Sequence, residues 1–98
     1  MTIEYIRYSV PEGERAAFIE AYRAAKAPLL SSPHALSFEI SQCDEDPGAF
    51  ILRIEWTSAA DHIEKFRGSA EFRAFFAHIK PYVGAITEMR HYTRLDAG

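Results

Sequence analysis

The sequence predicts a single small α+β domain over residues 1–98, with the ferredoxin-like order β-α-β-β-α-β and helices on one face of an antiparallel sheet. A length of 98 residues leaves room for one domain with a modest core. Alternating apolar and polar residues indicate strands, and apolar residues at three- and four-residue spacing indicate helices between them. Both faces of the first strand are apolar, so we also expect a two-fold dimer that covers the face without helices.

The first predicted strand spans residues 3–10, which are rich in β-branched and aromatic side chains. Because successive side chains of a strand point to opposite faces, Ile3 and Tyr5 lie on one face. The other face carries Ile6, Tyr8 and Val10. Apolar groups on both faces are typical of a strand that is buried on both sides.

A helix is predicted after this strand. Pro11 suits the first helical turn, and Glu12 and Glu14 are favourable near the positive end of the helix dipole. One apolar stripe follows, made of Ala17, Phe18, Ala21, Tyr22 and Ala25. Pro28 is expected to end the helix, and residues 29–33 are expected to form a loop.

Two strands joined by an acidic turn are predicted next. Leu36, Phe38 and Ile40 alternate with polar residues, which is the clearest strand pattern in the chain. Residues 44–48, Asp-Glu-Asp-Pro-Gly, are typical of a turn, because Pro fixes φ and Gly tolerates positive φ. Residues 50–57 alternate again, so the two strands are expected to form a hairpin.

The second helical region is predicted in two parts. Residues 58–61 have the spacing of a capping box, and a short helix that carries Ile63 and Phe66 is expected after them. Ser69 is a second N-cap candidate, and it precedes a new helical stripe. That stripe consists of Phe72, Phe75, Phe76 and Ile79. Residues 86–94 are predicted to form the last strand.

Charge, cysteine content and missing motifs disfavour several classes of function. The net charge is −3 and the basic residues are scattered, which argues against nucleic acid as a partner. The single cysteine, Cys43, lacks partners for an internal disulfide or a structural zinc site. Neither a phosphate-binding glycine motif nor GxSxG occurs. We see no signal peptide and no apolar run of ~20 residues, so we expect no membrane partner and a cytoplasmic location.

The four histidines are the candidates for proton transfer near neutral pH. His62 and His78 lie among polar neighbours on predicted helices and are expected at the surface. His34 follows Pro33 in a loop, where a role in the turn is the simpler interpretation. His91 lies on the last strand, which can direct it either into a site or into ordinary packing. No spacing such as HExxH indicates a bound metal.

Trp56 also has two interpretations. It ends the second hairpin strand, where a large buried ring commonly belongs to the core. Its indole N–H is equally suited to orienting a polar aromatic ligand.

Three stretches together resemble the antibiotic biosynthesis monooxygenase (ABM) family. They are SPHALSFEI at 32–40, DPGAFILRIEW at 46–56 and FRGSAEFRAF at 66–75. The resemblance implies a dimeric α+β barrel with a pocket in each subunit between the sheet and the helices. It also implies enzymes that oxidise quinols or polycyclic phenols with O2 and use neither metal nor flavin.

This sequence departs from the family pattern at two places. Many members have Pro-Gly where this chain has Pro33-His34. Many also carry a histidine in the helix after the tryptophan, where this chain has Lys65, with His62 a turn away. A related branch degrades haem with an asparagine on the first strand, and this chain contains no asparagine.

The resulting hypothesis is a cofactor-independent monooxygenase that oxidises a small phenol or quinol with O2, with a second copy of the chain as its only macromolecular partner. His91 is the proposed base, Trp56 and Tyr92 orient the substrate ring, and Tyr5 and Phe76 form the pocket wall. Two alternatives stay open. The same dimer is either a module that binds a small molecule without converting it, or a protein with this fold and no open pocket.

Overall fold

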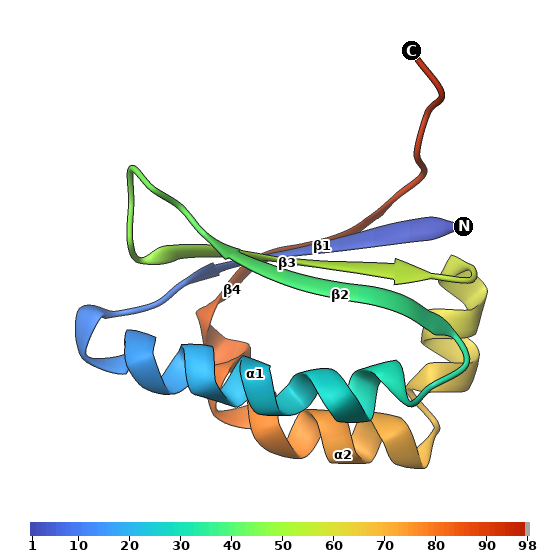
Figure 1. Ribbon diagram of the computed structural model, residues 1–98, viewed down its shortest axis with the longest axis horizontal. Coiled ribbons are helices and arrows are strands. Elements are labelled where there is room, and N and C mark those ends of the chain that lie inside the picture. Colours follow the sequence, from blue (N-terminus) through green and yellow to red (C-terminus); the bar gives the residue numbers. More distant parts are fainter. Residues whose placement is uncertain (98) are drawn as a thin grey trace.

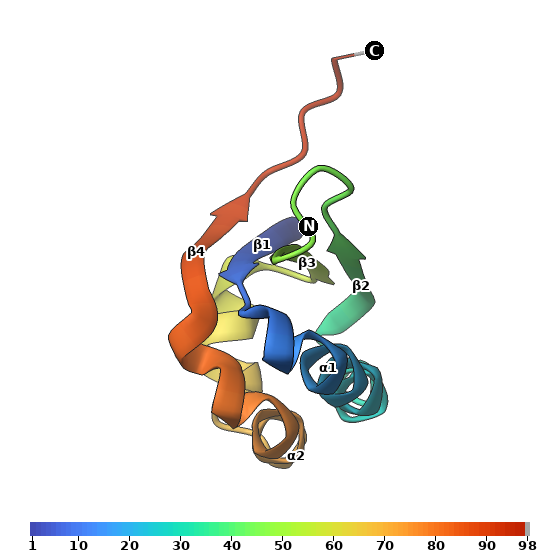
Figure 2. The same cartoon turned by 90° about the vertical axis from the view of Figure 1, so that its left-hand side faces the viewer.

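Four antiparallel strands form one sheet, and both α-helices cover the same face of it, in a computed structural model that describes residues 1–97 (Figure 1 and Figure 2). The strands are β1 (Thr2–Ser9), β2 (Ala35–Gln42), β3 (Ala49–Trp56) and β4 (Ile86–Tyr92). They lie side by side in the order β2-β3-β1-β4. The helices are α1 (Arg15–Leu30) and α2 (Ala70–Ile79), with the short helical segments η1 (Glu12–Glu14), η2 (Asp61–Phe66) and η3 (Lys80–Ala85). The predicted ferredoxin-like fold is confirmed.

Helix α1 continues past Pro28, so the expectation that this proline ends the helix is wrong. Pro28 lies in the last turn, and the helix reaches Leu30. Pro28 lacks only its own backbone N–H, and the N–H of Ser31 still donates to the carbonyl of Ala27 at 3.0 Å, so the helical turn continues past the proline. Leu29, predicted to be in a loop, is fully buried beneath the sheet and stabilises this final turn.

Strand β2 begins with a bulge that changes the predicted apolar stripe. Ala35 pairs with Trp56 and Ser37 pairs with Glu55, so Leu36 is an extra residue without a partner in β3. Half of the Leu36 side chain surface is therefore exposed, although the alternation predicted it on the apolar face. The hairpin of β2 and β3 is otherwise as predicted.

The second helical region has the two predicted parts. The Oγ of Ser58 accepts a hydrogen bond from the N–H of Asp61 at 3.0 Å, which confirms the predicted cap. The segment η2 that follows is a π-helix, with wider turns than an α-helix. Helix α2 then begins after Ser69, whose Oγ accepts a hydrogen bond from the N–H of Phe72 at 3.1 Å.

Replacement of the α2 cap gives a first test of these local interactions. Ser69→Ala removes the acceptor for a helix N–H and is expected to lower the free energy of unfolding by about 1 kcal/mol. Urea denaturation followed by circular dichroism measures the change. Ser9→Ala, at an exposed position of β1, is the control and is expected to change stability by less than about 0.5 kcal/mol. Equal effects of the two substitutions would contradict the capping role.

The core lies between the sheet and the helices. Phe18 of α1 is fully buried and contacts aromatic rings from β1, β3 and η3. The opposite face of the sheet has no helix over it (Figure 2). Tyr5 and Tyr92 lie on this open face, where their rings pack edge to face at 5.4 Å. None of the helices within residues 1–97 has the length and hydrophobicity needed to cross a bilayer.

Candidate functional site

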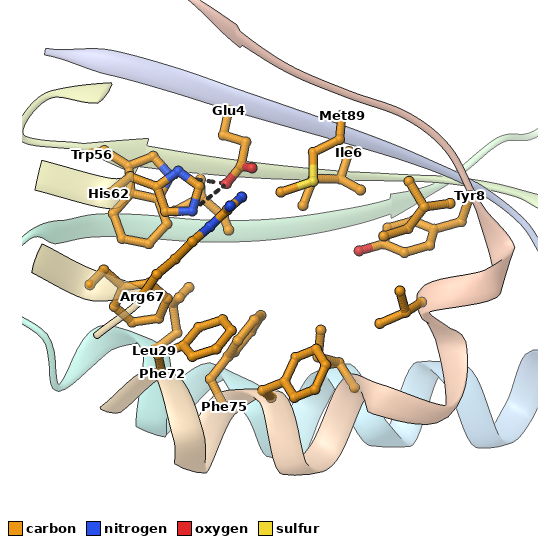
Figure 3. Close-up of a pocket in the computed structure, with 16 residues that line it drawn as sticks. Glu4, Ile6, Tyr8, Leu29, Trp56, His62, Arg67, Phe72, Phe75 and Met89 are labelled. Atoms are coloured by element: carbon orange, nitrogen blue, oxygen red, sulfur yellow. Dashed lines mark hydrogen bonds and ion pairs between the residues drawn. The ribbon is translucent and has the colours of Figure 1, made fainter. Parts of the chain in front are cut away.

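A cavity of about 220 Å³ lies between the inner face of the sheet and the helical layer. Aliphatic and aromatic side chains form most of its wall; Glu4, His62 and Arg67 gather at the end near Trp56, and Tyr8 lies at the other end (Figure 3). The lining residues are Glu4, Ile6, Tyr8, Leu29, Ile54, Trp56, His62, Phe66, Arg67, Phe72, Phe75, Phe76, Ile79, Val83, Ile86 and Met89. An apolar cavity with a few polar groups at one end is the usual form of a small-molecule site.

Glu4 is the most unusual residue of this wall. The alternation of β1 points Glu4 inward together with Ile6 and Tyr8, and the Glu4 side chain is 1% exposed. Its Oε1 accepts a hydrogen bond from the indole Nε1–H of Trp56 at 3.1 Å. Its Oε2 is buried without a hydrogen-bond partner. A buried carboxyl oxygen without a partner costs free energy, which makes it a candidate for function.

The surroundings of Glu4 change its acidity. Burial raises the pKa of the Glu4 carboxyl from 4.5 to about 7, against the lowering effects of the Trp56 hydrogen bond and the Arg67 charge. A carboxyl with a pKa near 7 takes up and releases protons readily at physiological pH. That property is the one expected of a general base.

His62 is buried, so the prediction that it lies at the surface is wrong. Its imidazole stacks on the indole of Trp56, with ring centres 4.3 Å apart and planes at 14°. The π-helical turn of η2 explains the inward position, because the N–H of Arg67 bonds to the carbonyl of His62 five residues back. Burial, with the charge of Arg67 and the proximity of His91, lowers the pKa of His62 from 6.5 to about 4.

The two nitrogens of His62 face different partners. Nδ1 is 2.7 Å from Nε2 of His91, which is a short hydrogen bond. Nε2 is 3.7 Å from Oε1 of Glu4. His91 pairs directly with Glu4 across β1 and β4, so both point to the inner face. His91 is only half-buried, and burial followed by the Arg67 charge lowers its pKa.

Glu4, His62 and His91 also have the chemistry of metal ligands. One ligand atom from each lies within 4.8 Å of the others, and two imidazoles with one carboxylate suit several divalent metals. A metal uses only one nitrogen of an imidazole, however, whereas the two nitrogens of His62 are directed at different neighbours. The guanidinium of Arg67 also raises the cost of a cation here (Figure 3). A chain of hydrogen-bonding groups therefore describes the cluster better than a chelate.

The structure brings some of the predicted site residues together and separates others. Trp56 and Phe76 line the cavity, as the hypothesis placed them. Tyr5 and Tyr92 do not, because they lie on the opposite face of the sheet, and their placement in the same pocket is wrong. His91 reaches the cluster through His62 and does not itself line the cavity.

Three functional candidates were missed from the sequence, namely Glu4, His62 and Arg67. A signal for Glu4 exists, because this charged residue interrupts the inward stripe of the first strand, on which Ile6 and Tyr8 lie. For His62 the signal was its place a turn from the histidine that many family members carry after the tryptophan, and Arg67 had none. The positions of both depend on the local winding of η2.

The fold and this site define an α+β domain with an aromatic-lined cavity between sheet and helices, and comparison with known proteins then gives the family. The chain belongs to the antibiotic biosynthesis monooxygenase family, whose sequence model matches residues 1–78. A relative is the uncharacterized protein YczJ of Bacillus subtilis (strain 168), which is 29% identical over 93 residues. That match covers 94% of this chain and 97% of YczJ.

Solved structures from other organisms share the fold. A provisionally named antibiotic biosynthesis monooxygenase from Bordetella bronchiseptica has a TM-score of 0.78 and 20% identity, covering 96% of each chain. A protein with the same provisional name from Nitrosomonas europaea has a TM-score of 0.75 and 21% identity, covering 97% of this chain and 99% of its own. Rv0793 from Mycobacterium tuberculosis has a TM-score of 0.76 and 15% identity, covering 97% of this chain and 95% of its own. Such low identities support the fold alone.

Proposed function

We propose that this protein is a cofactor-independent monooxygenase that oxidises a small phenol or quinol with O2 in the cavity beneath the sheet. The observation that carries the proposal is the unpartnered Oε2 of Glu4, a buried carboxyl oxygen in a wall of mostly apolar groups. A phenol hydroxyl bound there gives this oxygen its missing hydrogen-bond donor. The rest of the ring then contacts aromatic side chains.

The cavity volume limits the size of the substrate. An apolar protein cavity of about 150 Å³ is enough to hold benzene. The cavity here measures about 220 Å³, which suits one or two fused rings. Trp56 and Phe76 lie in its wall, as expected of residues that hold a flat ring. Large polycyclic phenols require the helical layer to move.

The proposed reaction begins with proton transfer. Glu4, in its ionised form, accepts the phenol proton, and the positive charge of Arg67 favours the phenolate that remains. The phenolate transfers one electron to O2, and the two radicals combine to form a carbon–oxygen bond. One oxygen atom then stays on the ring and the other leaves as water, so that the substrate supplies all the electrons. Because His91 does not line the cavity, we assign the first acceptance of the proton to Glu4.

Oxygen uptake tests this proposal. Purified protein, treated with a chelator, is given a panel of one- and two-ring phenols and quinols in an oxygen electrode. We expect uptake above the rate of autoxidation, unchanged by the chelator, and a product that carries one labelled oxygen atom from 18O2. The absence of catalysed uptake across the panel would overturn the proposal. Ligand binding without uptake would instead identify a module that binds a small molecule without converting it.

A further inference from the structure

We propose that Glu4, His62 and His91 form a proton relay that leads from the cavity to solvent beside β4. The inference rests on the proposed function for the identity of the proton donor, a bound phenol. Glu4 touches the substrate and is the catalytic residue. His62 also lines the cavity and takes the proton on from Glu4, whereas His91 lies outside the cavity wall and acts on the substrate only through these two residues.

The geometry of His62 carries the proposal. Its two ring nitrogens lie on opposite sides of the ring, with Nε2 toward the carboxyl of Glu4 and Nδ1 bonded to His91. A neutral imidazole accepts a proton at one nitrogen and donates one from the other, so this orientation allows transfer through the ring. The stacked indole of Trp56 fixes the plane of the ring, with 14° between the two planes. The contact between His62 and His91 is the shorter of the two links, at 2.7 Å.

The burial of Glu4 makes a relay to solvent necessary. A proton accepted by Glu4 cannot pass directly to bulk water, because this side chain is 1% exposed. Glu4 must lose that proton before it accepts another. His91 is half-buried on an edge strand of the sheet, so its ring borders solvent. Glu4 is the most buried of the three residues and His91 is the least buried. One ligand atom from each lies within 4.8 Å of the others, so the path from the cavity to solvent is short.

Each step of the transfer conserves protons and charge. The phenol O–H bond breaks and a Glu4 O–H bond forms. Glu4 then gives this proton to Nε2 of His62, while the Nδ1–H of His62 passes to Nε2 of His91. The Nδ1–H of His91 leaves to water, so the net result is a bound phenolate, an ionised Glu4, both imidazoles in their other tautomer and one proton in solution. No oxidant or reductant takes part in these steps.

The longer link requires a small movement. The 3.7 Å between Oε1 of Glu4 and Nε2 of His62 exceeds a hydrogen bond, so the carboxyl must turn toward the ring for transfer. The charged or titratable groups that face His62 are Glu4 from β1, His91 from β4 and Arg67 beyond η2. The positive charge of Arg67 disfavours protonation of the His62 and His91 rings to the cationic form. The proton therefore passes through His62 and is not held there.

Chemical rescue of a His91 variant tests the relay. His91→Ala leaves a gap that borders solvent, which added imidazole can enter. Anaerobic rapid mixing with 2-naphthol, in weak buffer with a pH indicator, follows both the bound naphtholate and the released proton. We expect His91→Ala to slow proton release about 100-fold, with unchanged naphthol affinity and unchanged first formation of naphtholate, and imidazole to restore the rate of release in proportion to its concentration. His78→Ala, at an exposed position of α2, is expected to behave as the wild type, with no response to imidazole.

A second variant separates proton transfer from structural support. His91→Gln keeps a side chain that can hydrogen-bond to His62 but has no ring to pass a proton through. We expect His91→Gln to be as slow as His91→Ala. Proton release at the wild-type rate in either variant overturns the relay. A slow His91→Ala protein that imidazole does not rescue overturns it as well.

The assay distinguishes failure of the relay from failure of the proposed function. It uses no oxygen, so it follows proton transfer independently of oxidation. Rescued proton release without oxygen uptake would support the relay and reject the oxidation. Oxygen uptake, together with His91 variants that release the proton at the wild-type rate, would support the oxidation and reject the relay. If the wild-type protein neither binds nor deprotonates 2-naphthol, the relay is rejected.

Discussion

Glu4→Gln is expected to produce a more stable and much less active protein. Glu4 is ionisable but buried, with one carboxyl oxygen unpartnered, so its charged form is costly in the folded state. A neutral amide of similar shape avoids that cost. At pH 7 we expect the free energy of unfolding to increase by up to about 3 kcal/mol, from the rise of the Glu4 pKa from 4.5 to about 7. Phenol oxidation is expected to fall about 100-fold, because the amide accepts no proton.

Two buried groups, Glu4 and His62, make the stability of the protein depend on pH in opposite directions. Glu4 holds its proton more tightly in the folded state, so its contribution to stability is complete below pH 4.5 and is lost as pH rises toward about 7. His62 acts in the opposite sense, because its pKa falls from 6.5 to about 4 on folding. Its contribution is complete above pH 6.5 and is lost as pH falls toward about 4. The two contributions nearly cancel in the wild-type protein.

Glu4→Gln removes one of these opposing contributions. We therefore expect the stability of the variant to rise by up to about 3 kcal/mol between pH 4 and 6.5, where the contributions of Glu4 and His62 in the wild type offset each other. Urea denaturation at a series of pH values measures both curves. Glu12→Gln, at an exposed position of η1, is the control and is expected to keep the shape of the wild-type curve. A Glu4→Gln protein that is less stable than the wild type at pH 7 would contradict the buried, costly carboxylate.

The local patterns of the sequence were sufficient for the order of the elements. Alternation along β3 and the helical stripe of α2 depend on neighbouring residues only, and they identified both elements. The bulge at Leu36 and the continuation of α1 through Pro28 depend on contacts made elsewhere in the fold. Propensity predicts a break at Pro28, which the burial of Leu29 overrides, whereas alternation predicts Leu36 on the apolar face, which the burial of Ala35 overrides.

The candidate site was harder to predict than the fold. Both faces of β1 carry apolar groups, so the sequence did not decide which face the helices cover, and Tyr5 was assigned to the wrong side of the sheet. His62 turns inward because η2 winds as a π-helix, and a pattern based on 3.6 residues per turn does not anticipate that winding. The role of His91, the base proposed from the sequence, stays a prediction. Glu4 can be identified as the residue opposite His91 in the sheet only once the register of β1 and β4 is known.

Trp56→Ala is expected to have the largest effect on stability. The indole is fully buried, stacks on His62 and packs against Phe66 at 4.8 Å between ring centres. Truncation of a buried tryptophan typically costs about 3–5 kcal/mol. The whole domain is stabilised by about 5–15 kcal/mol, so this variant is expected to lose a large part of its stability. Chemical denaturation followed by circular dichroism measures the loss.

Trp56→Phe separates the packing of this ring from its hydrogen bond. Phenylalanine keeps much of the apolar contact, so we expect the loss of stability to be well below that of Trp56→Ala. It removes the Nε1–H donor that lowers the pKa of Glu4, so that pKa rises further above its ordinary value. The acidic limb of the activity profile is therefore expected to move to higher pH, because the base is ionised only at higher pH. An activity profile that coincides with that of the wild type would show that the Trp56 indole supports the fold without tuning the base.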